Sequence, residues 1–178
     1  MGQQPGGQRH DLLSRTTGGI ARRRHRAGIG RRPAVGVRAQ LKKSPPRRTV
    51  RCDDPPPDAL LRGIEEFNRQ EFFEQHETLE GIWIREPDEV RYLYQGILQV
   101  GVGFYHWRRG NWKGAVAKLG HGLAKLEPYR PVCMTIDVER LVRETAALRA
   151  ELEARGPDDL PSFPPPRLPH VHRLMNPA

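Results

Sequence analysis

The sequence has little of several features that would assign it to a familiar class of protein. It holds only two cysteines, Cys52 and Cys133, which lie far apart and form no C-x-x-C pair. This spacing implies neither a disulfide framework nor a zinc-thiolate site, and it favours a reducing, cytoplasmic location. No apolar segment follows the early arginines, so we expect no secretory signal peptide. Apolar and polar residues nowhere alternate for long enough to predict a β-strand.

Long uninterrupted apolar runs are also missing. The most apolar stretch, Val90 to Trp107, is broken by Arg91, Gln95, Gln99 and His106. A span of about 18 residues with this many polar groups is typical of a buried core helix. We therefore predict a central helix here and no membrane span.

Acidic residues are almost absent from the first part of the chain. Residues 1–51 contain Asp11 as their sole acid and 14 of the 30 Lys and Arg, a charge of +13, whereas the remainder carries −4. The basic stretch has no apolar periodicity with which to bury surface, so it is predicted to be disordered. The expected organisation is a basic arm over 1–55, a helical domain over 56–156 and a proline-rich tail over 157–178.

Three explanations of the arm remain open. An arginine-rich, acid-poor leader resembles an organelle transit peptide, which would make an organelle the alternative location. Clustered arginines also favour weak, non-specific contact with nucleic acid, because they release counterions from phosphate. An over-extended start in a GC-rich gene would give the same composition. That start would require a non-AUG codon, such as that of Val37 or Val50, because no methionine occurs between Met1 and Met134.

Helical periodicity accounts for the middle of the chain. Apolar residues recur at helical spacing in five segments that proline, glycine or asparagine separates. The predicted helices cover residues 58–68, 71–86, 88–109, 111–129 and about 135–156. The third is apolar almost all round and belongs at the centre. The prediction is an all-α fold of about five antiparallel helices.

Glycines and prolines add two expectations. Gly114, Gly120 and Gly122 each cost about 1 kcal/mol relative to alanine within a helix, so a close approach to a neighbouring helix is expected there. The tail cannot be helical because proline recurs throughout it. Its P-x-x-P spacings would suit an aromatic groove of a partner, and a tail that lies over the domain is the alternative.

The stretch "EQHETLEGIW" carries the most distinctive polar pattern. It begins like the H-E-x-x-H helix of zinc proteases, but Glu80 stands in place of the second histidine. At about 100° per residue, His76, Glu80 and Trp83 share one stripe of their helix. A second stripe lies on the predicted central helix and consists of Gln95, Gln99 and His106. Because unpartnered buried polar groups are costly, these polar side chains are expected to face one another across the two helices.

Three ordered motifs run through this region: Asn68-x-x-x-Phe72-Phe73-x-x-His76-Glu77-x-x-Glu80-x-x-Trp83, Tyr94-Gln95-Gly96-Ile97-Leu98-Gln99, and Gly110-Asn111-x-x-Gly114-Ala115. Together they resemble the small helical bacterial, archaeal and plastid-lineage proteins known as domain of unknown function 309, over about residues 58–156. The resemblance implies an all-helical fold with a shared His-Glu-Glu-Trp and Gln-Gly-Gln core, and it brings no established activity. The family usually has glycine where Gln70 stands, so the first turn is expected to be formed differently here.

The polar cluster has three interpretations. A buried hydrogen-bond network, in which Glu80 anchors His76 while Gln95 and Gln99 satisfy their neighbours, would make the domain a non-catalytic binding or structural module. A small-ligand pocket with Trp83, Gln95 and Gln99 among its contacts is the second. The third is a metal-assisted or general-base enzyme, such as a hydrolase, that uses His76, Glu80 and His106. A divalent metal suits these residues but is not favoured over the first interpretation.

Acidic side chains on the first two predicted helices have a simpler explanation. They are Glu65, Glu66, Glu71, Glu74 and Glu77. Their number and spacing are typical of a solvated helix face. We expect all of them to be exposed.

Overall fold

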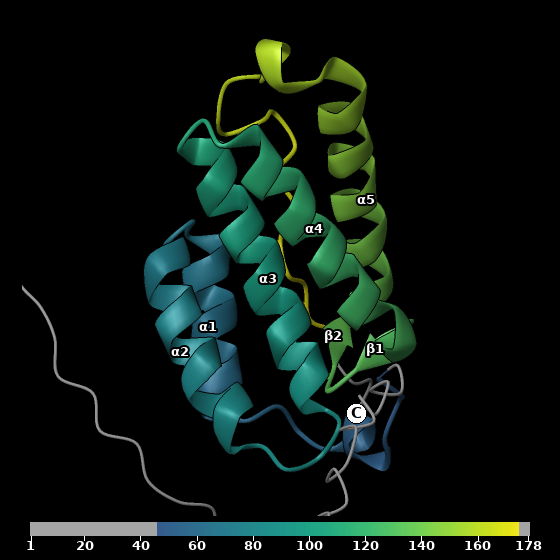
Figure 1. Cartoon of the computed structure of the whole chain (residues 1–178). Helices are drawn as coiled ribbons and strands as arrows, with labels where there is room; N and C mark the ends of the chain where they lie inside the picture. The colour runs from purple at the N-terminus through teal and green to yellow at the C-terminus, as the bar shows by residue number, and fades with distance from the viewer. Residues whose placement is uncertain (1–45, 175–178) are drawn as a thin grey trace, which may run out of the picture. The chain divides into compact units, whose positions relative to one another are not determined.

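The central helix of the chain is the most deeply buried one, and the other helices lie on either side of it (Figure 1). The structure, a computed structural model, describes residues 46–174. The predictions for residues 1–45 and 175–178 lie outside this part. Five α-helices occur within it: α1 (Asp58–Asn68), α2 (Phe72–Arg85), α3 (Arg91–Arg108), α4 (Trp112–Leu126) and α5 (Val138–Arg155). The predicted all-α fold of about five helices is confirmed.

The position of α3 follows from its apolar surface. Its buried side chains include Leu93, Tyr94, Ile97, Leu98, Val100, Phe104 and Trp107. α2 packs on one side of it and α4 on the other (Figure 1). A Cβ on Gly122 of α4 would stand 2.7 Å from Val100 Cγ2 and 3.0 Å from the carbonyl oxygen of Gly96. The predicted close approach of two helices is therefore confirmed at Gly122.

In the described part of the chain, no helix combines the length and the apolar character needed to cross a membrane. This includes α3, which occupies the most apolar stretch of the sequence. The predicted core helix is thus confirmed.

A short β-hairpin connects α4 to α5. β1 (Val132–Cys133) and β2 (Ile136–Asp137) pair in antiparallel register, and the turn between them places Met134 and Thr135 at positive φ. Each strand has only two residues. The sequence analysis did not predict these strands because alternation over two residues carries no periodic pattern.

The proline-rich tail lies over the helices, as one of its two interpretations expects. Trp107 Nε1 donates to the carbonyl oxygen of Pro161 at 2.7 Å, and the Phe163 ring packs against the rings of Phe72 and Trp107. Further along, the Asn68 side chain accepts from Val171 N at 2.8 Å and donates to Val171 O at 3.0 Å. Asn68 of the first motif thus holds the tail against the end of α1.

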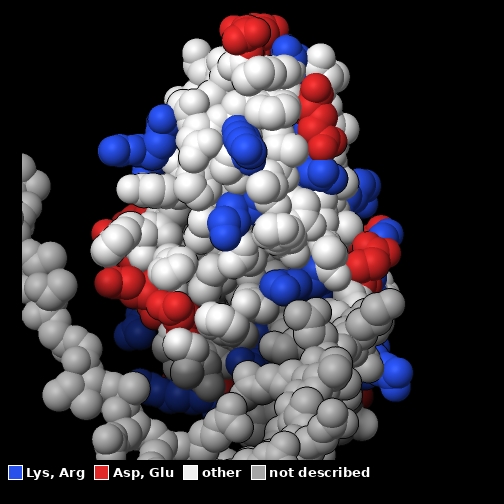
Figure 2. All heavy atoms as spheres, viewed as in Figure 1, with Lys and Arg blue, Asp and Glu red and all other residues white. Residues whose placement is uncertain are grey.

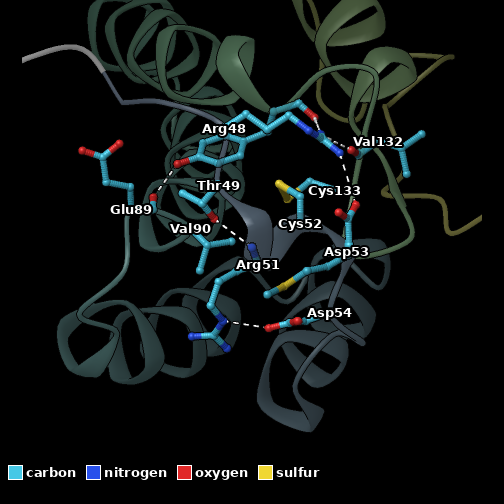
Figure 3. The surroundings of a disulfide bond; sticks show 12 residues. Arg48, Thr49, Arg51, Cys52, Asp53, Asp54, Glu89, Val90, Val132 and Cys133 are labelled. Carbon is cyan, nitrogen blue, oxygen red and sulfur yellow. Dashed lines mark hydrogen bonds and ion pairs between the residues drawn. A yellow bond between two sulfur atoms is a disulfide. The ribbon is translucent and has the colours of Figure 1, made fainter.

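The two cysteines form a disulfide, so the expectation of no disulfide is wrong. Cys52 belongs to a single 3-10 turn, η1 (Val50–Asp53), and its bond to Cys133 of β1 links residues 81 positions apart (Figure 3). Sequence spacing could not show this contact, because the chain folds back between them. Disulfides are rare in reducing compartments, so the bond is unusual for the expected cytoplasmic location. That location stays a prediction.

The disulfide also shows that the packed part of the chain begins before the expected boundary at residue 55. Residues 46–57, which we call the N-terminal clasp, lie against the hairpin and the α2–α3 connection through hydrogen bonds of Arg47, Arg48 and Arg51. The expected arm boundary at residue 55 falls inside this clasp. Pro57 is the N-cap of α1, and Asp58 is its first residue.

The turn between α1 and α2 takes a glycine-like conformation despite its glutamine. Gln70 has a φ of 63°, in the left-handed region that glycine adopts readily. Gln70 N donates to Phe67 O and Glu71 N to Glu66 O, both at 2.9 Å, which satisfies carbonyls at the end of α1. Gln70 thus adopts a conformation that suits glycine, and the expected difference from the family at this turn stays a prediction.

Replacement of Gln70 by glycine should stabilise the domain by about 0.5–1 kcal/mol, because the left-handed conformation is costly for a residue with a Cβ. Equilibrium unfolding in urea measures the change in the free energy of unfolding. Gln70→Ala is the matched control and should show no gain, since alanine keeps the Cβ. Equal effects of the two substitutions would contradict this account of the turn.

Candidate functional site

A fully buried glutamine lies where α2 crosses α3. Gln75 has no exposed surface, and its Nε2 donates to the carbonyl oxygen of Ile97 at 3.3 Å. Its Oε1 has no hydrogen-bond partner and lies against Gly101, where a Cβ would stand only 2.3 Å away. The amide therefore fits into a gap that exists because position 101 carries no side chain.

Next to this contact, α2 and α3 enclose a small pocket of about 290 Å³. Its lining residues are Phe72, Phe73, His76, Val102, Tyr105 and His106. His76 follows Gln75 and Val102 follows Gly101, so the pocket adjoins the buried amide directly. The structure thus brings His76 and His106, which the sequence singled out on separate helices, to one site.

The turn after α3 orients the ring of His106. Asn111 Oδ1 accepts from Gly114 N at 2.8 Å, which leaves Asn111 Nδ2 as the atom that faces His106 Nδ1 at 3.1 Å. An amide nitrogen can only donate, so Nδ1 is the acceptor in this contact and the ring hydrogen lies on Nε2. The Gly110-Asn111-x-x-Gly114 motif therefore leaves the Nε2–H group of His106 as a donor.

Gly114 is needed for this arrangement. A Cβ at this position would lie 2.6 Å from Asn111 Nδ2 and 2.8 Å from Cγ and Nδ1 of His106. These distances are too short for any real contact, so a larger residue would separate the asparagine from the imidazole.

The other predicted site residues do not form the expected buried network. His76, Glu80, Trp83, Gln95 and Gln99 are half-buried. Among the residues that the structure describes, no hydrogen bond joins any two of them, and Trp83 Nε1 and Gln99 Oε1 are buried without a partner. The stripes were predicted from angular position alone, which does not show how far each side chain lies from the helix interface.

An arginine side chain stacks on aromatic rings where α2 ends and α3 begins. The guanidinium of Arg91 lies over the Trp83 ring, with Cζ 5.7 Å from its centroid, and over the Tyr92 ring at 5.8 Å. In such cation–π contacts, the positive charge of the arginine is attracted to the face of the tryptophan ring. Trp83 is thus fixed by Arg91 rather than by the polar residues of the expected cluster.

Metal binding was one interpretation of His76, Glu80 and His106. Within residues 46–174, no three His, Cys, Asp or Glu side chains are grouped so that they could hold a metal ion. Glu80 does not line the pocket that contains the two histidines.

Tyr94, which opens the second motif, has a packing role. Its hydroxyl donates to Met134 Sδ at 3.7 Å, and burial raises the pKa of its phenol to about 12. A nearby carboxylate, Glu86, acts in the same direction. The hydroxyl therefore stays neutral near pH 7 and does not serve as a base.

Two buried polar residues were missed by the sequence analysis. Gln75 lies three residues after Phe72 and four before Leu79, both buried, so its position on the apolar stripe of α2 could have revealed it. Glu66 was expected to be exposed but is only 9% exposed, and Thr78 Oγ1 donates to its Oε1 at 3.1 Å. That expectation is wrong, because α2 covers the side of α1 that carries Glu66.

Acidic side chains lie at the margins of the visible surface. Figure 2 shows one acidic group at the edge over α2 and others at the top and along the α5 side, whereas Lys and Arg side chains are spread over the face formed by α3 and α4. Glu74 and Glu77 are the fully exposed acids of α2. The pocket opens beside this acidic helix and is itself lined by uncharged or imidazole side chains.

Comparison with known proteins agrees with the motifs. Residues 60–117 match the model of a family described as "Domain of unknown function (DUF309)". The chain is similar to this family over that segment. A curated relative, "Uncharacterized protein YpuF" of Bacillus subtilis (strain 168), is 34% identical over 73 residues, which cover 40% of this chain and 42% of that protein. No solved structure matches the chain significantly.

The DUF309 match covers the whole candidate site. It takes in most of α1, all of α2 and α3, and the start of α4 with Asn111 and Gly114. The clasp, the hairpin, α5 and the tail lie outside it. The pocket is therefore built from the DUF309 segment alone.

Substitution of Gly114 by alanine should release His106 from Asn111 and let both protonation forms of its ring occur. Nitrogen NMR shifts of the imidazole distinguish the forms. Wild-type protein should show His106 protonated at Nε2 alone, and Gly114→Ala should show a mixture. Ala117→Gly, at an exposed position on the same helix, is the control for general loosening of α4. An unchanged Nε2–H form in Gly114→Ala would contradict the close contact.

Proposed function

We propose that the domain is a non-catalytic binding module, and that the pocket between α2 and α3 receives a small planar group that carries a hydrogen-bond acceptor. The observation that supports this most is that two histidines from different helices line one otherwise apolar pocket. Its volume of about 290 Å³ is near the lower end of the range for ligand sites.

The planar shape follows from the walls. Phe72, Phe73 and Tyr105 present aromatic rings, and such rings favour stacked or edge-to-face contacts with another ring. The acceptor follows from His106, because Asn111 occupies its Nδ1 and leaves the Nε2 hydrogen for a ligand. Phe73 is 58% exposed, which is unusual for phenylalanine and places an apolar side chain at the mouth of the pocket.

The enzyme alternative has less support. A histidine base needs a partner that orients its ring. No hydrogen bond joins His76 to Glu80 or to another side chain in the described part of the chain. His76 is therefore better suited to contact a ligand than to remove a proton from it.

Trp83, Gln95 and Gln99 are proposed as secondary contacts along the same helix pair. Trp83 Nε1 and Gln99 Oε1 offer one donor and one acceptor that lack partners. A ligand that extends from the pocket toward the α2–α3 connection would satisfy them, since unpaired buried polar atoms are costly.

Quinoline is a suitable probe, because it is planar and small and its ring nitrogen accepts a hydrogen bond. In carbon-13 NMR spectra, quinoline should shift the ring Cε1–H signals of His76 and His106. Phe73→Ser should weaken its binding by about fivefold, roughly 1 kcal/mol. Ile84→Ser is the matched control, because Ile84 is 62% exposed on the same helix and does not line the pocket. It should leave the affinity unchanged.

Other outcomes would rule out the pocket, place the binding site elsewhere or favour the metal-assisted alternative. If quinoline shifts the signals of neither histidine, or if both serine variants weaken its binding equally, the pocket is not the site. Loss of binding in Trp83→Phe with retention in Phe73→Ser would move the site to the Trp83–Gln99 region. If a chelator abolishes binding in wild-type protein, the metal-assisted alternative through His76 and His106 is favoured instead.

A further inference from the structure

The two cysteines of the chain are joined to each other, and their bond ties the N-terminal clasp to the hairpin. Cys52 and Cys133 both lie outside residues 60–117. The bond therefore belongs to the parts that surround the DUF309 segment. It holds together two regions that are separated by 81 positions in the sequence.

Apart from Cys52, the clasp buries none of its residues completely. Val50, in the same turn, is 85% exposed, and the remaining residues of 46–57 are half-buried or exposed. Cys52 itself is 4% exposed and sits within the main apolar core. Cys52 is thus the one buried side chain through which the hydrophobic effect stabilises the clasp. The disulfide fixes its position.

The other contacts of the clasp are polar and lie near the surface. Arg48 donates to the carbonyl oxygens of Tyr129 and Val132 (Figure 3). Arg51 pairs with Glu86 at 2.9 Å. One backbone bond, from Met134 N to Cys52 O at 2.7 Å, adds to these. Ion pairs at partly exposed positions contribute little and are screened by salt. Without the covalent bond, these contacts alone would hold the clasp.

We propose that the Cys52–Cys133 bond is a site of reversible thiol–disulfide exchange with a dithiol reductant, and that reduction releases the clasp while the helices stay folded. Cys52 is the sulfur that the reductant attacks, because Cys133 has no exposed surface. Cys52 itself belongs to one short 3-10 turn, so local opening of a few residues suffices for access.

The exchange takes place in two steps. One thiolate of the dithiol attacks Cys52 Sγ, the bond to Cys133 breaks, and Cys133 leaves as a thiolate that takes up a proton. The second thiol of the reductant then attacks the mixed disulfide, and Cys52 leaves as a thiol. Two electrons and two protons pass from the dithiol to the cysteines, and the dithiol becomes a disulfide.

Release should be confined to the clasp. α1 keeps its own buried contacts through Leu60, Ile64 and Phe67, and the hairpin keeps its pairing with the tail at Ile136 and Arg173. Reduction therefore frees residues 46–57 at one end and leaves them attached to α1 at the other. This proposal does not depend on the ligand pocket.

Trypsin tests the release in the full-length protein, because Arg48 and Arg51 lie in the clasp. Cleavage after Arg51, followed by mass spectrometry, should be at least about tenfold faster with dithiothreitol than without it, since cleavage reports local opening. The far-UV circular dichroism should not change. A Cys52→Ala/Cys133→Ala variant should be cleaved rapidly in both conditions, which controls for effects of the reductant on trypsin.

Wild-type protein suffices if the variant does not fold. The proposal is overturned if the peptides that contain Cys52 and Cys133 stay linked in dithiothreitol until a denaturant is added. It is also overturned if the bond is reduced but cleavage after Arg51 keeps its rate, or if helical signal is lost together with the bond. Two free thiols in protein purified without reductant would show that the bond does not form.

Discussion

The contact between Gln75 and Gly101 fixes how α2 lies on α3, and the candidate site depends on it. A buried side chain that reaches across a helix pair needs both a partner for its polar atoms and space for its volume. Gln75 finds the partner in Ile97 O and the space at Gly101. Because the amide has no exposed surface, it cannot turn aside into solvent. The two helices are therefore locked in one register, in which His76 and Val102 follow as neighbours.

The pocket is the consequence of that register. Side chains next to the buried contact in both helices, aromatic ones among them, line the pocket between α2 and α3. The turn after α3 then sets the chemistry of the site, since Asn111 and Gly114 leave His106 with a free N–H donor. α4 supports this arrangement from the other side of α3 by its close approach at Gly122. Packing thus accounts for the position of each side chain in the pocket.

Local sequence patterns predicted the helices, but they could not predict contacts between distant parts of the chain. The apolar periodicity of α3 and the cap at Asn111 are properties of a few adjacent residues, so the sequence shows them directly. The bond between Cys52 and Cys133 joins distant positions, and only the folded chain reveals it. The polar stripes of α2 and α3 were placed on the correct helices, but their depth was not predictable, because angular position does not fix burial. Gln75 could have been found from its place between two apolar residues of one stripe.

A double-mutant cycle at positions 75 and 101 tests the central contact most directly. Gly101→Ala should destabilise the wild-type domain by about 1–3 kcal/mol, because its methyl group overpacks the space that the amide fills. In a Gln75→Ala background the same substitution should be neutral or stabilising, since the space is then vacant and alanine is the better helix former by about 1 kcal/mol. Urea unfolding of the four proteins gives the coupling energy between the two positions. A change of sign between the backgrounds supports the account, whereas an equal cost of Gly101→Ala in both would contradict it.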